Sequence, residues 1–221
     1  MSMVGMTMPM TRVFDNRVEA GRALAQSLLA YRGATNAIVL ALPRGGVPVG
    51  FEVAQALGLP LDVLVVRKLG LPGQPELAMG AIATGGALVL NEEVLRFADG
   101  REAALEQVRR REQVELERRE RQYRGARPPL QLAGRTGILV DDGLATGATM
   151  EVAVRALRGL GATRIVVAVP VASREARNRI AALADEVVCL EAPMFFSAVG
   201  QWYRDFGQTS DAEVSELLAR A

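Results

Sequence analysis

Two adjacent aspartates, Asp141 and Asp142, follow a short apolar run and precede a loop of small residues. The small side chains let backbone N–H groups approach an anion closely, and a helix expected after Gly147 adds the positive end of its dipole. The residues of this candidate phosphate loop are Ala145, Thr146, Gly147, Ala148 and Thr149. Carboxylates beside such a loop suit sugar hydroxyls or a hydrated Mg²⁺. The pattern therefore indicates a sugar-phosphate site.

Three other interpretations of this segment fit less well. A nucleotide P-loop has Lys and then Ser or Thr after its last glycine, whereas Ala148 follows Gly147. An aspartyl phosphatase would use Asp141 or Asp142 as nucleophile and a later basic residue for the phosphate. The only lysine, Lys68, lies upstream, so an arginine would have to serve. An ordinary turn whose aspartates cap the helix is the simplest alternative.

A second candidate anion site is the segment Arg44-Gly45-Gly46, which follows the apolar run 37–42. Paired glycines tolerate unusual backbone angles and allow a close approach to a ligand. A helix is expected directly afterwards, over residues 47–57. A surface arginine beside a glycine turn is also common, so this segment alone is only moderately specific.

Lys68 stands out because it is the only lysine among 26 basic residues. It follows Arg67 at the end of the apolar run 62–66 and precedes a segment rich in glycine and proline. That composition predicts a mobile loop over 69–80 and then a hairpin over 81–89. Because Lys and Arg are not interchangeable as anion ligands, we interpret Lys68 as a functional cation at a mobile lid rather than a solvated loop residue.

Strands and helices that alternate along the chain must position these segments. Short apolar runs predict strands at 37–42, 62–66, 137–140, 164–169 and 186–190, with helices after most of them. This order predicts an α/β fold, a Rossmann-like parallel sheet covered by helices on both faces. Ligands of such sheets bind beyond the carboxyl ends of the strands, where Arg44, Lys68 and Asp141 would meet.

The chain is expected to form one domain. We expect a disordered N-terminus at residues 1–13 and a single domain over residues 14–221. Asp15 or Asn16 can cap the first helix. The Arg- and Glu-rich segment 101–124 predicts a solvated helix with ion pairs between residues four apart.

Composition excludes several function classes. The chain has no histidine, which removes histidine-based catalysis and histidine-ligated metal sites. Its single cysteine, Cys189, excludes an intrachain disulfide, and the apolar run around it predicts a buried small hydrophobe. A net charge of +1 gives no basic footprint for nucleic acid or membrane. We expect a cytoplasmic protein with no membrane partner and no nucleic-acid partner.

The segment from Asp141 to Met150 resembles the phosphoribosyl pyrophosphate (PRPP) motif of type I phosphoribosyltransferases, especially the adenine phosphoribosyltransferase version. Residues 43–48 resemble the pyrophosphate loop of the bacterial xanthine and guanine enzymes. Residues 67–80 occupy the place of the family's flexible catalytic loop. The order of elements agrees over residues 14–190, and the chain as a whole is similar to uncharacterised bacterial phosphoribosyltransferase-like proteins.

The resemblance implies a type I phosphoribosyltransferase fold with a small hood, and transfer of 5-phosphoribosyl from PRPP to a nitrogen of a base, with a purine expected. Asp141 and Asp142 would hold the ribose hydroxyls and stabilise positive charge, and loop 145–149 would hold the 5′-phosphate. Mg²⁺ would bind mainly through PRPP oxygens, with the aspartates as possible further ligands. The residues that would receive pyrophosphate are Arg44, Gly45, Gly46, Arg67 and Lys68, of which Lys68 would also be catalytic. The family often has a non-proline cis peptide, which here would precede Arg44.

The hood is expected at residues 193–208, followed by the C-terminal helix. This stretch holds five of the ten aromatic residues. Phe195, Phe196 and Trp202 are candidates for stacking on a base, and packing of the last helix onto the core is the alternative. Ala145 stands where 6-oxopurine enzymes carry an acid, which disfavours hypoxanthine and guanine.

Two further expectations follow from the resemblance. One is a homodimer. The other is an alternative function: a PRPP-sensing regulator on the same fold that binds RNA or DNA without turnover. The sequence has no helix-turn-helix signature, and its near-neutral charge disfavours the DNA version. Gly143 also departs from the family pattern, which usually has an aliphatic residue there.

Overall fold

The computed structural model describes residues 12–97 and 101–221. Within these residues, the body of the molecule is built on a five-stranded parallel sheet with strand order β2-β1-β6-β7-β8. Its strands are β1 (Ala37–Ala41), β2 (Leu61–Val63), β6 (Thr136–Val140), β7 (Arg164–Val171) and β8 (Glu186–Glu191). The predicted α/β fold with a parallel central sheet is confirmed.

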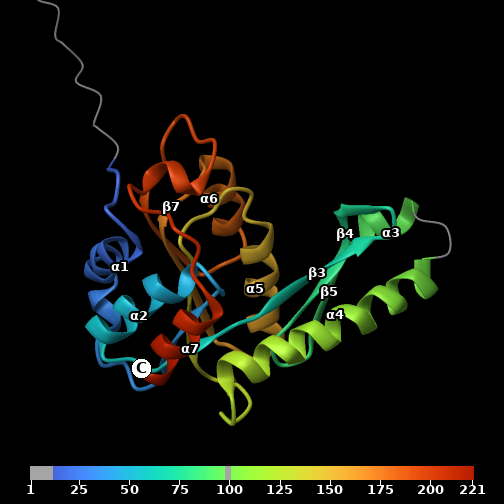
Figure 1. Ribbon diagram of the computed structural model, residues 1–221, viewed down its shortest axis with the longest axis horizontal. Coiled ribbons are helices and arrows are strands. Elements are labelled where there is room, and N and C mark those ends of the chain that lie inside the picture. Colours follow the sequence, from blue (N-terminus) through green and yellow to red (C-terminus); the bar gives the residue numbers. More distant parts are fainter. Residues whose placement is uncertain (1–11, 98–100) are drawn as a thin grey trace, which may run out of the picture.

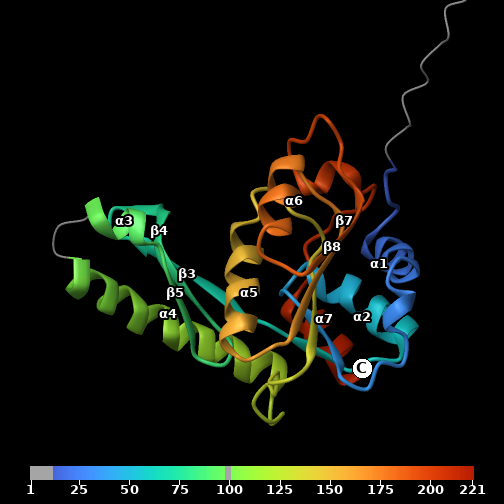
Figure 2. The ribbon, with the colours of Figure 1, turned by 180° about the vertical axis from the view of Figure 1, so that it is seen from behind.

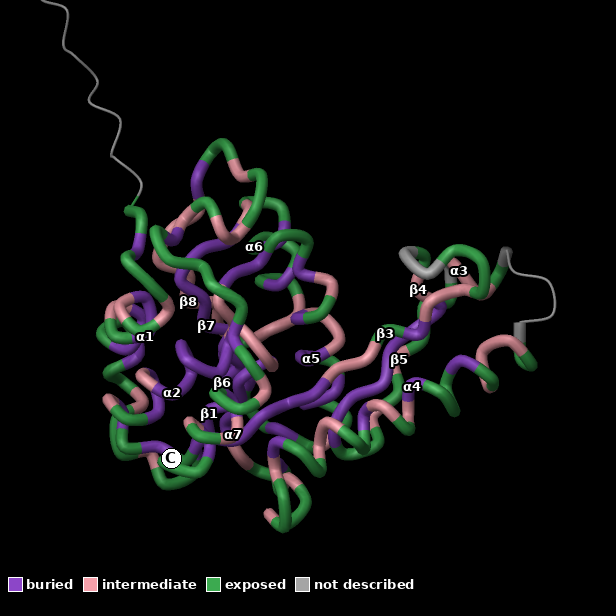
Figure 3. The backbone as a smooth tube through the Cα atoms, viewed as in Figure 1, coloured by how far each residue is buried: buried purple, intermediate pink, exposed green. Residues whose placement is uncertain are grey.

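Helices cover both faces of this sheet (Figures 1 and 2). One face carries α1 (Arg17–Gln26), α2 (Gly46–Leu57) and α7 (Asp211–Ala219), and the other carries α5 (Ala148–Gly159) and α6 (Arg174–Ala181). Successive side chains of a strand point to opposite faces, so Val39 packs with the α2 side and Leu40 with the α5 side. This double burial explains why the central strands are apolar along their whole length, and they form the buried centre in Figure 3.

Side-chain caps set where three helices begin. Asn16 accepts a hydrogen bond from the Glu19 N–H at 3.0 Å, which selects Asn16 over Asp15 as the predicted cap of α1. Ser173 and Ser210 cap α6 and α7 in the same way. Helix α1 ends at Gln26, and a short 3-10 turn, η1 (Leu29–Tyr31), follows.

A second sheet projects from the body as an arm (Figure 1). The arm consists of the antiparallel strands β3 (Val66–Leu71), β4 (Gln74–Ala83) and β5 (Ala87–Leu90), together with α3 (Glu92–Phe97) and α4 (Arg101–Arg124). The predicted hairpin around Gly85 and Gly86 is confirmed, since both have positive φ between β4 and β5.

The prediction of an irregular loop over residues 69–80 was wrong. This segment contains the second half of β3 and most of β4, joined by a tight turn in which Gly73 has φ +82°. Gly80 lies inside β4, where a Cβ would come within 2.4 Å of the Val89 carbonyl oxygen on β5. The glycines and prolines therefore serve a turn and a close strand contact instead of breaking the structure.

Helix α4 matches the predicted segment 101–124, and its exposed face carries the expected ion pairs, such as Glu106 with Arg110. Its other face is buried and contributes Val108, Leu116 and Tyr123 to the core. The helix therefore packs against the strands of the arm with one face and is exposed to solvent on the other.

The segment after β8 returns over the body and pairs with the start of the described chain. The Phe14 N–H donates to the Trp202 carbonyl at 2.8 Å, and the Arg204 N–H donates to the Phe14 carbonyl at 2.9 Å. Most of the expected N-terminal segment, residues 1–13, lies outside the described residues. No helix in the described part of the chain is long and apolar enough to cross a membrane.

Candidate functional site

The site begins where β1 and β6 end side by side. Ala41 pairs with Val140, so the segment after β1 runs directly against the aspartate pair. A Cβ on Gly45 would lie 2.1 Å from Asp142 Oδ2, and a Cβ on Gly46 would lie 2.7 Å from the Val140 carbonyl oxygen. Only glycines allow this approach. The peptide bond before Arg44 is cis, as the family resemblance led us to expect.

Asp141 and Asp142 are half-buried at this edge. Asp141 Oδ1 accepts a hydrogen bond from the Asp142 N–H at 2.8 Å. Burial raises the pKa of Asp141 well above its usual range, and the neighbouring charge of Asp142 raises it further. Burial also raises the pKa of Asp142, although the guanidinium of Arg17 opposes this effect. Two adjacent, partly buried carboxylates with raised pKa values are expected of a binding site rather than of a simple helix cap.

Arg17, the first residue of α1, is a site residue that the sequence did not reveal. Its Nε lies 2.9 Å and its Nη2 lies 2.8 Å from Asp142 Oδ2. It also donates to the Gly207 carbonyl at 2.7 Å and lies 4.0 Å over the Phe206 ring. The only signal in the sequence is weak. A cation in the first turn of a helix is unfavourable beside the positive end of the helix dipole, so the presence of Arg17 there indicates a stabilising partner elsewhere.

The predicted phosphate loop forms the entrance to α5. Gly147 has φ +76° and caps the helix without a side chain, so the positive helix end is not covered by a capping oxygen from this residue. The carbonyls of Ala145 and Thr146 accept hydrogen bonds from Ser173 and Arg179, which fixes the loop against α6. Its exposed surface is therefore suited to an anion at the first turn of α5.

Residues 193–208, the predicted hood, contact the aspartate segment. The Tyr203 hydroxyl donates to the Asp142 carbonyl at 2.6 Å. Gly143, the departure noted in the sequence, has a structural reason: a Cβ there would lie 2.6 Å from Val199 Cγ1. The hood therefore packs directly on the loop that carries the aspartates.

The aromatic residues of the hood are only partly available to a ligand. Phe196 and Trp202 stack on each other, with ring centroids 6.5 Å apart, and pack against the small core around Tyr203. Phe195 is 83% exposed. Packing therefore occupies much of the aromatic surface, and base stacking by these residues stays a prediction.

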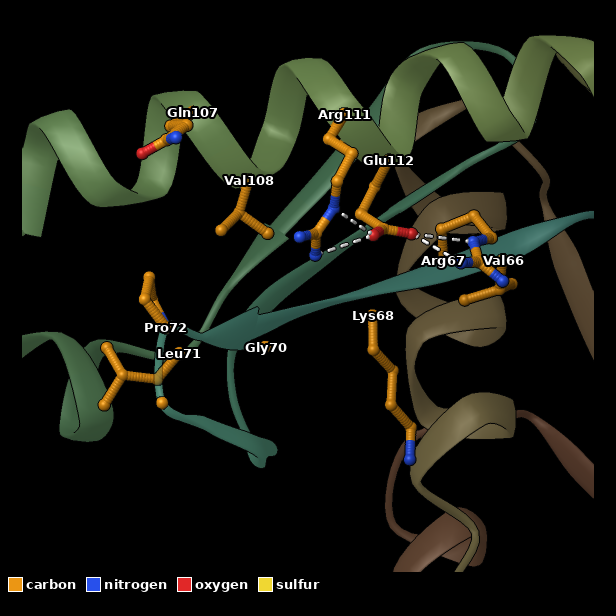
Figure 4. Close-up of a pocket in the computed structure, with 11 residues that line it drawn as sticks. Val66, Arg67, Lys68, Gly70, Leu71, Pro72, Gln107, Val108, Arg111 and Glu112 are labelled. Carbon is orange, nitrogen blue, oxygen red and sulfur yellow. Dashed lines mark hydrogen bonds and ion pairs between the residues drawn. The ribbon is translucent and has the colours of Figure 1, made fainter.

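The predicted cations lie in different surroundings. Arg44 lies 3.9 Å from Asp211, the first residue of α7. Arg67 donates from two nitrogens to Glu112 on α4, at 2.9 and 2.5 Å. Figure 4 shows Lys68 directed away from this pair, because successive residues of β3 face opposite sides of the sheet. Arg67 and Lys68 therefore both line the cavity between β3 and α4, but their side chains point apart.

Two cavities of about 630 Å³ flank β3. One lies between β3 and α4 and includes Arg67, Arg111 and Glu112 (Figure 4). The other lies between the arm and α5, and its lining includes Lys68 together with Ala148 at the start of α5. Lys68 lines both cavities and shares the second one with Ala148 of the phosphate loop, whereas Arg67 lines only the first.

A resident metal centre is not built from the described side chains. No group of three or more His, Cys, Asp and Glu residues in this part of the chain could hold a metal ion. The aspartate pair can supply only part of a ligand set, so the donor set fits an ion that is held mainly by oxygens of a bound ligand.

Comparison with known proteins agrees with this geometry. Residues 11–205 match the family model of the phosphoribosyl transferase domain. Two Mycobacterium tuberculosis proteins, from strains CDC 1551 and H37Rv, carry names that assign them provisionally to the phosphoribosyl transferases. Each is 52% identical over 210 residues, which is 95% of this chain and 47% of the relative, so the chain spans about half the length of these relatives.

A solved structure is similar over nearly the whole chain. The crystal structure of the protein TT1426 from Thermus thermophilus has a TM-score of 0.84 and 48% sequence identity. The match covers 94% of this chain and 98% of that chain. By its matching domain model and its relatives, this chain belongs to the phosphoribosyl transferase domain family.

Proposed function

We propose that this protein transfers the 5-phosphoribosyl group of PRPP to a nitrogen of a base and releases pyrophosphate. The observation that carries the proposal is the meeting of three segments at one sheet edge. The pair Asp141 and Asp142 and the loop 145–149 are neighbours in the chain, whereas the glycine segment 44–46 comes from a distant part of it and meets the aspartates at the ends of β1 and β6. They offer an anion site, a carboxylate pair and a second close backbone approach.

Each segment has a role in this reaction. The loop 145–149 holds the 5′-phosphate at the first turn of α5. Asp141 and Asp142 bind ribose hydroxyls and stabilise the positive charge that develops at C1′ as the bond to pyrophosphate breaks. Arg44, with the backbone of Gly45 and Gly46, receives the leaving pyrophosphate.

Lys68 and Arg67 have different standing in this proposal. Lys68 shares its cavity with Ala148, so we assign the second cation for pyrophosphate to Lys68. Arg67 would first have to leave Glu112. Mg²⁺ bound to the oxygens of PRPP would supply further charge neutralisation, with the aspartate pair as its protein ligands.

A purine is the acceptor that we propose, on the strength of the adenine-type PRPP motif and of Ala145, which places no acid at the loop. Phe195, Phe196 and Trp202 are the proposed stacking residues. We further propose that the protein works in the cytoplasm, as a homodimer. The described single cysteine is free, which agrees with a reducing compartment.

The direct test is release of pyrophosphate from PRPP and Mg²⁺ in the presence of single bases. We expect turnover with adenine and little with hypoxanthine or guanine. Turnover with hypoxanthine alone would overturn the preference for adenine, and turnover with a pyrimidine alone would overturn the assignment of a purine. Calorimetric binding of PRPP without pyrophosphate release on any base would overturn the enzyme and favour a PRPP-sensing regulator.

A further inference from the structure

Arg17 is held more firmly than a surface arginine. Its side chain is only 12% exposed, and its guanidinium contacts three segments at once. These contacts are the carboxylate of Asp142, the carbonyl of Gly207 and the ring of Phe206. A planar guanidinium can make all of them together, whereas a lysine ammonium cannot. The site is therefore built around an arginine at this position.

The contacts of Arg17 occupy only one of the two carboxylate oxygens of Asp142. Both of its short contacts with the carboxylate go to Oδ2, at 2.9 and 2.8 Å. Its guanidinium does not use Oδ1, so Oδ1 can bind a sugar hydroxyl while the ion pair persists. Arg17 and a substrate are therefore compatible on the same aspartate.

The charge of Arg17 answers a physical problem of this site. The proposed substrate is a polyanion, and two adjacent half-buried carboxylates repel it. In the described residues, Arg17 is the one cation that forms an ion pair with either Asp141 or Asp142. Its guanidinium offsets the negative charge of the Asp142 carboxylate.

We infer that Arg17 is a positioning residue that holds the Asp142 carboxylate in place and offsets its charge, so that an anionic sugar phosphate can bind against the aspartate pair. This inference rests on the proposed function. By this inference, α1 is one of the elements that build the site. The contacts of Arg17 with Phe206 and Gly207 then support substrate binding as well as packing.

The first test compares Arg17→Met, Arg17→Lys and the control Arg22→Met at saturating Mg²⁺. Arg22 lies on the same helix and pairs with Glu52 at an exposed position. Removal of a charged hydrogen-bonding partner should weaken PRPP binding about 10- to 100-fold in Arg17→Met. The KM for PRPP should rise more than kcat falls, and Arg17→Lys should recover part of the loss. Arg22→Met should match the wild type.

The second test uses a double variant and does not depend on turnover. Asp142→Asn combined with Arg17→Met restores the net charge of the wild-type cluster. We expect calorimetry to show tighter PRPP binding by the double variant than by Arg17→Met alone, by about fivefold or more. Emission of Trp202, the only tryptophan, and thermal unfolding report whether the hood and the fold persist.

The outcomes separate this inference from the proposed function. Binding of PRPP by Arg17→Met with wild-type affinity would overturn the inference. Arg17→Met that weakens PRPP binding equally in the wild type and in Asp142→Asn would also overturn it, because Arg17 would then act independently of Asp142. Equal losses in the Lys and Met variants, accompanied by a changed Trp202 emission, would indicate a role in hood packing only and would overturn it too. Wild-type protein that binds PRPP without turnover would overturn the proposed function, while the comparison of affinities still tests Arg17.

Discussion

Asp142 is the residue on which the proposed chemistry most depends. Asp142→Asn keeps the size of the side chain and the backbone carbonyl that Tyr203 contacts, but it removes the charge. We expect pyrophosphate release to fall at least about 100-fold, as for other preorganised contacts to a charged transition state. The fold should persist, although the unfolding temperature should fall because Arg17 loses its carboxylate partner. Steady-state kinetics and thermal unfolding measure the two effects.

A matched control for this change is Asp185→Asn. Asp185 pairs with Arg158 at 2.7 Å and precedes β8, so it lies at the amino end of the strands, away from the site. This variant should keep its activity. Full activity of Asp142→Asn, or equal loss in both variants, would contradict the role given to Asp142.

Cys189 allows a prediction about pH. Burial raises the pKa of its thiol to about 11, so at pH 8 the thiolate is about 100-fold rarer than for a free cysteine with its ordinary pKa of 9.0. We expect a disulfide reagent at pH 8 to label the folded protein at least 100-fold more slowly than the protein in denaturant. Similar rates in both states would show that the thiol is open to solvent.

The same pKa shift of Cys189 fixes the sign of a stability effect. Between pH 9 and pH 11 the folded state keeps a proton that the unfolded state loses. The free energy of unfolding should therefore fall as the pH rises through this range, and Cys189→Ala should make that fall shallower. An unchanged slope in Cys189→Ala would assign the effect to other groups.

At the scale of residues, the sequence reveals what is local. The chemistry of Asp141 and Asp142 and the cis peptide before Arg44 follow from short contiguous motifs. Arg17 does not, because it meets Asp142 across 125 positions of the chain and carries no motif of its own. Gly143 is similar: its meaning depends on Val199, which only the folded hood brings near.

Among the elements, α4 gives the clearest energetic prediction. Arg124, its last residue, donates to the buried Asp62 on β2 at 3.0 Å, and both side chains are 10% exposed. Arg124→Met leaves this carboxylate with the Val63 N–H at 2.8 Å and, as its one cationic contact, Arg127 at 4.0 Å. We expect a loss of about 3 kcal/mol in the free energy of unfolding, measured by urea titration.

The comparison for this effect is Arg110→Met on the same helix. Arg110 is highly exposed and pairs with Glu106. Such surface pairs contribute about 0.5 kcal/mol or less, so this variant should unfold close to the wild type. If both variants lose the same stability, the anchoring role of Arg124 is wrong.

Element prediction from sequence succeeds for the buried sheet and, within the arm, for the β4–β5 hairpin and α4, but it fails for β3 and the first part of β4. Central strands are read from continuous apolar runs, because burial on both faces demands them. In β3 and β4, Gly70, Pro72, Gly73 and Gly80 resemble a loop by composition alone. Their positions in a turn and at a close strand contact become visible only when the partner strands are known.

At the scale of the whole molecule, two sets of contacts attach the arm to the edge of the body, and we call them its roots. One is the buried Thr84, whose N–H and hydroxyl both bond to the backbone of Val65. The other is the anchor of Arg124 on Asp62. Near the second root, Tyr123 on α4 donates to Asp211, which also pairs with Arg44 in the site. Asp211 therefore connects the arm, through Tyr123, with Arg44 in the glycine segment of the site.

This arrangement makes Lys68 the point where the arm can serve the reaction. Lys68 lies two residues into β3, close to the first root, and faces the cavity that Ala148 also lines. Because the side chain is exposed, Lys68→Met should leave the unfolding temperature unchanged. Loss of a positive charge that receives pyrophosphate should lower kcat/KM for PRPP about 100-fold.

The control for Lys68 lies on the other face of the same sheet. Arg111 on α4 is exposed and faces the cavity that includes Glu112, so Arg111→Met removes an equal charge from the arm without touching the α5 side (Figure 4). Its kcat/KM should stay within about twofold of the wild type. Equal losses in the two variants would mean that the overall charge of the arm attracts PRPP. Full activity of Lys68→Met would exclude this lysine from the reaction, because no other lysine exists in the chain to replace it.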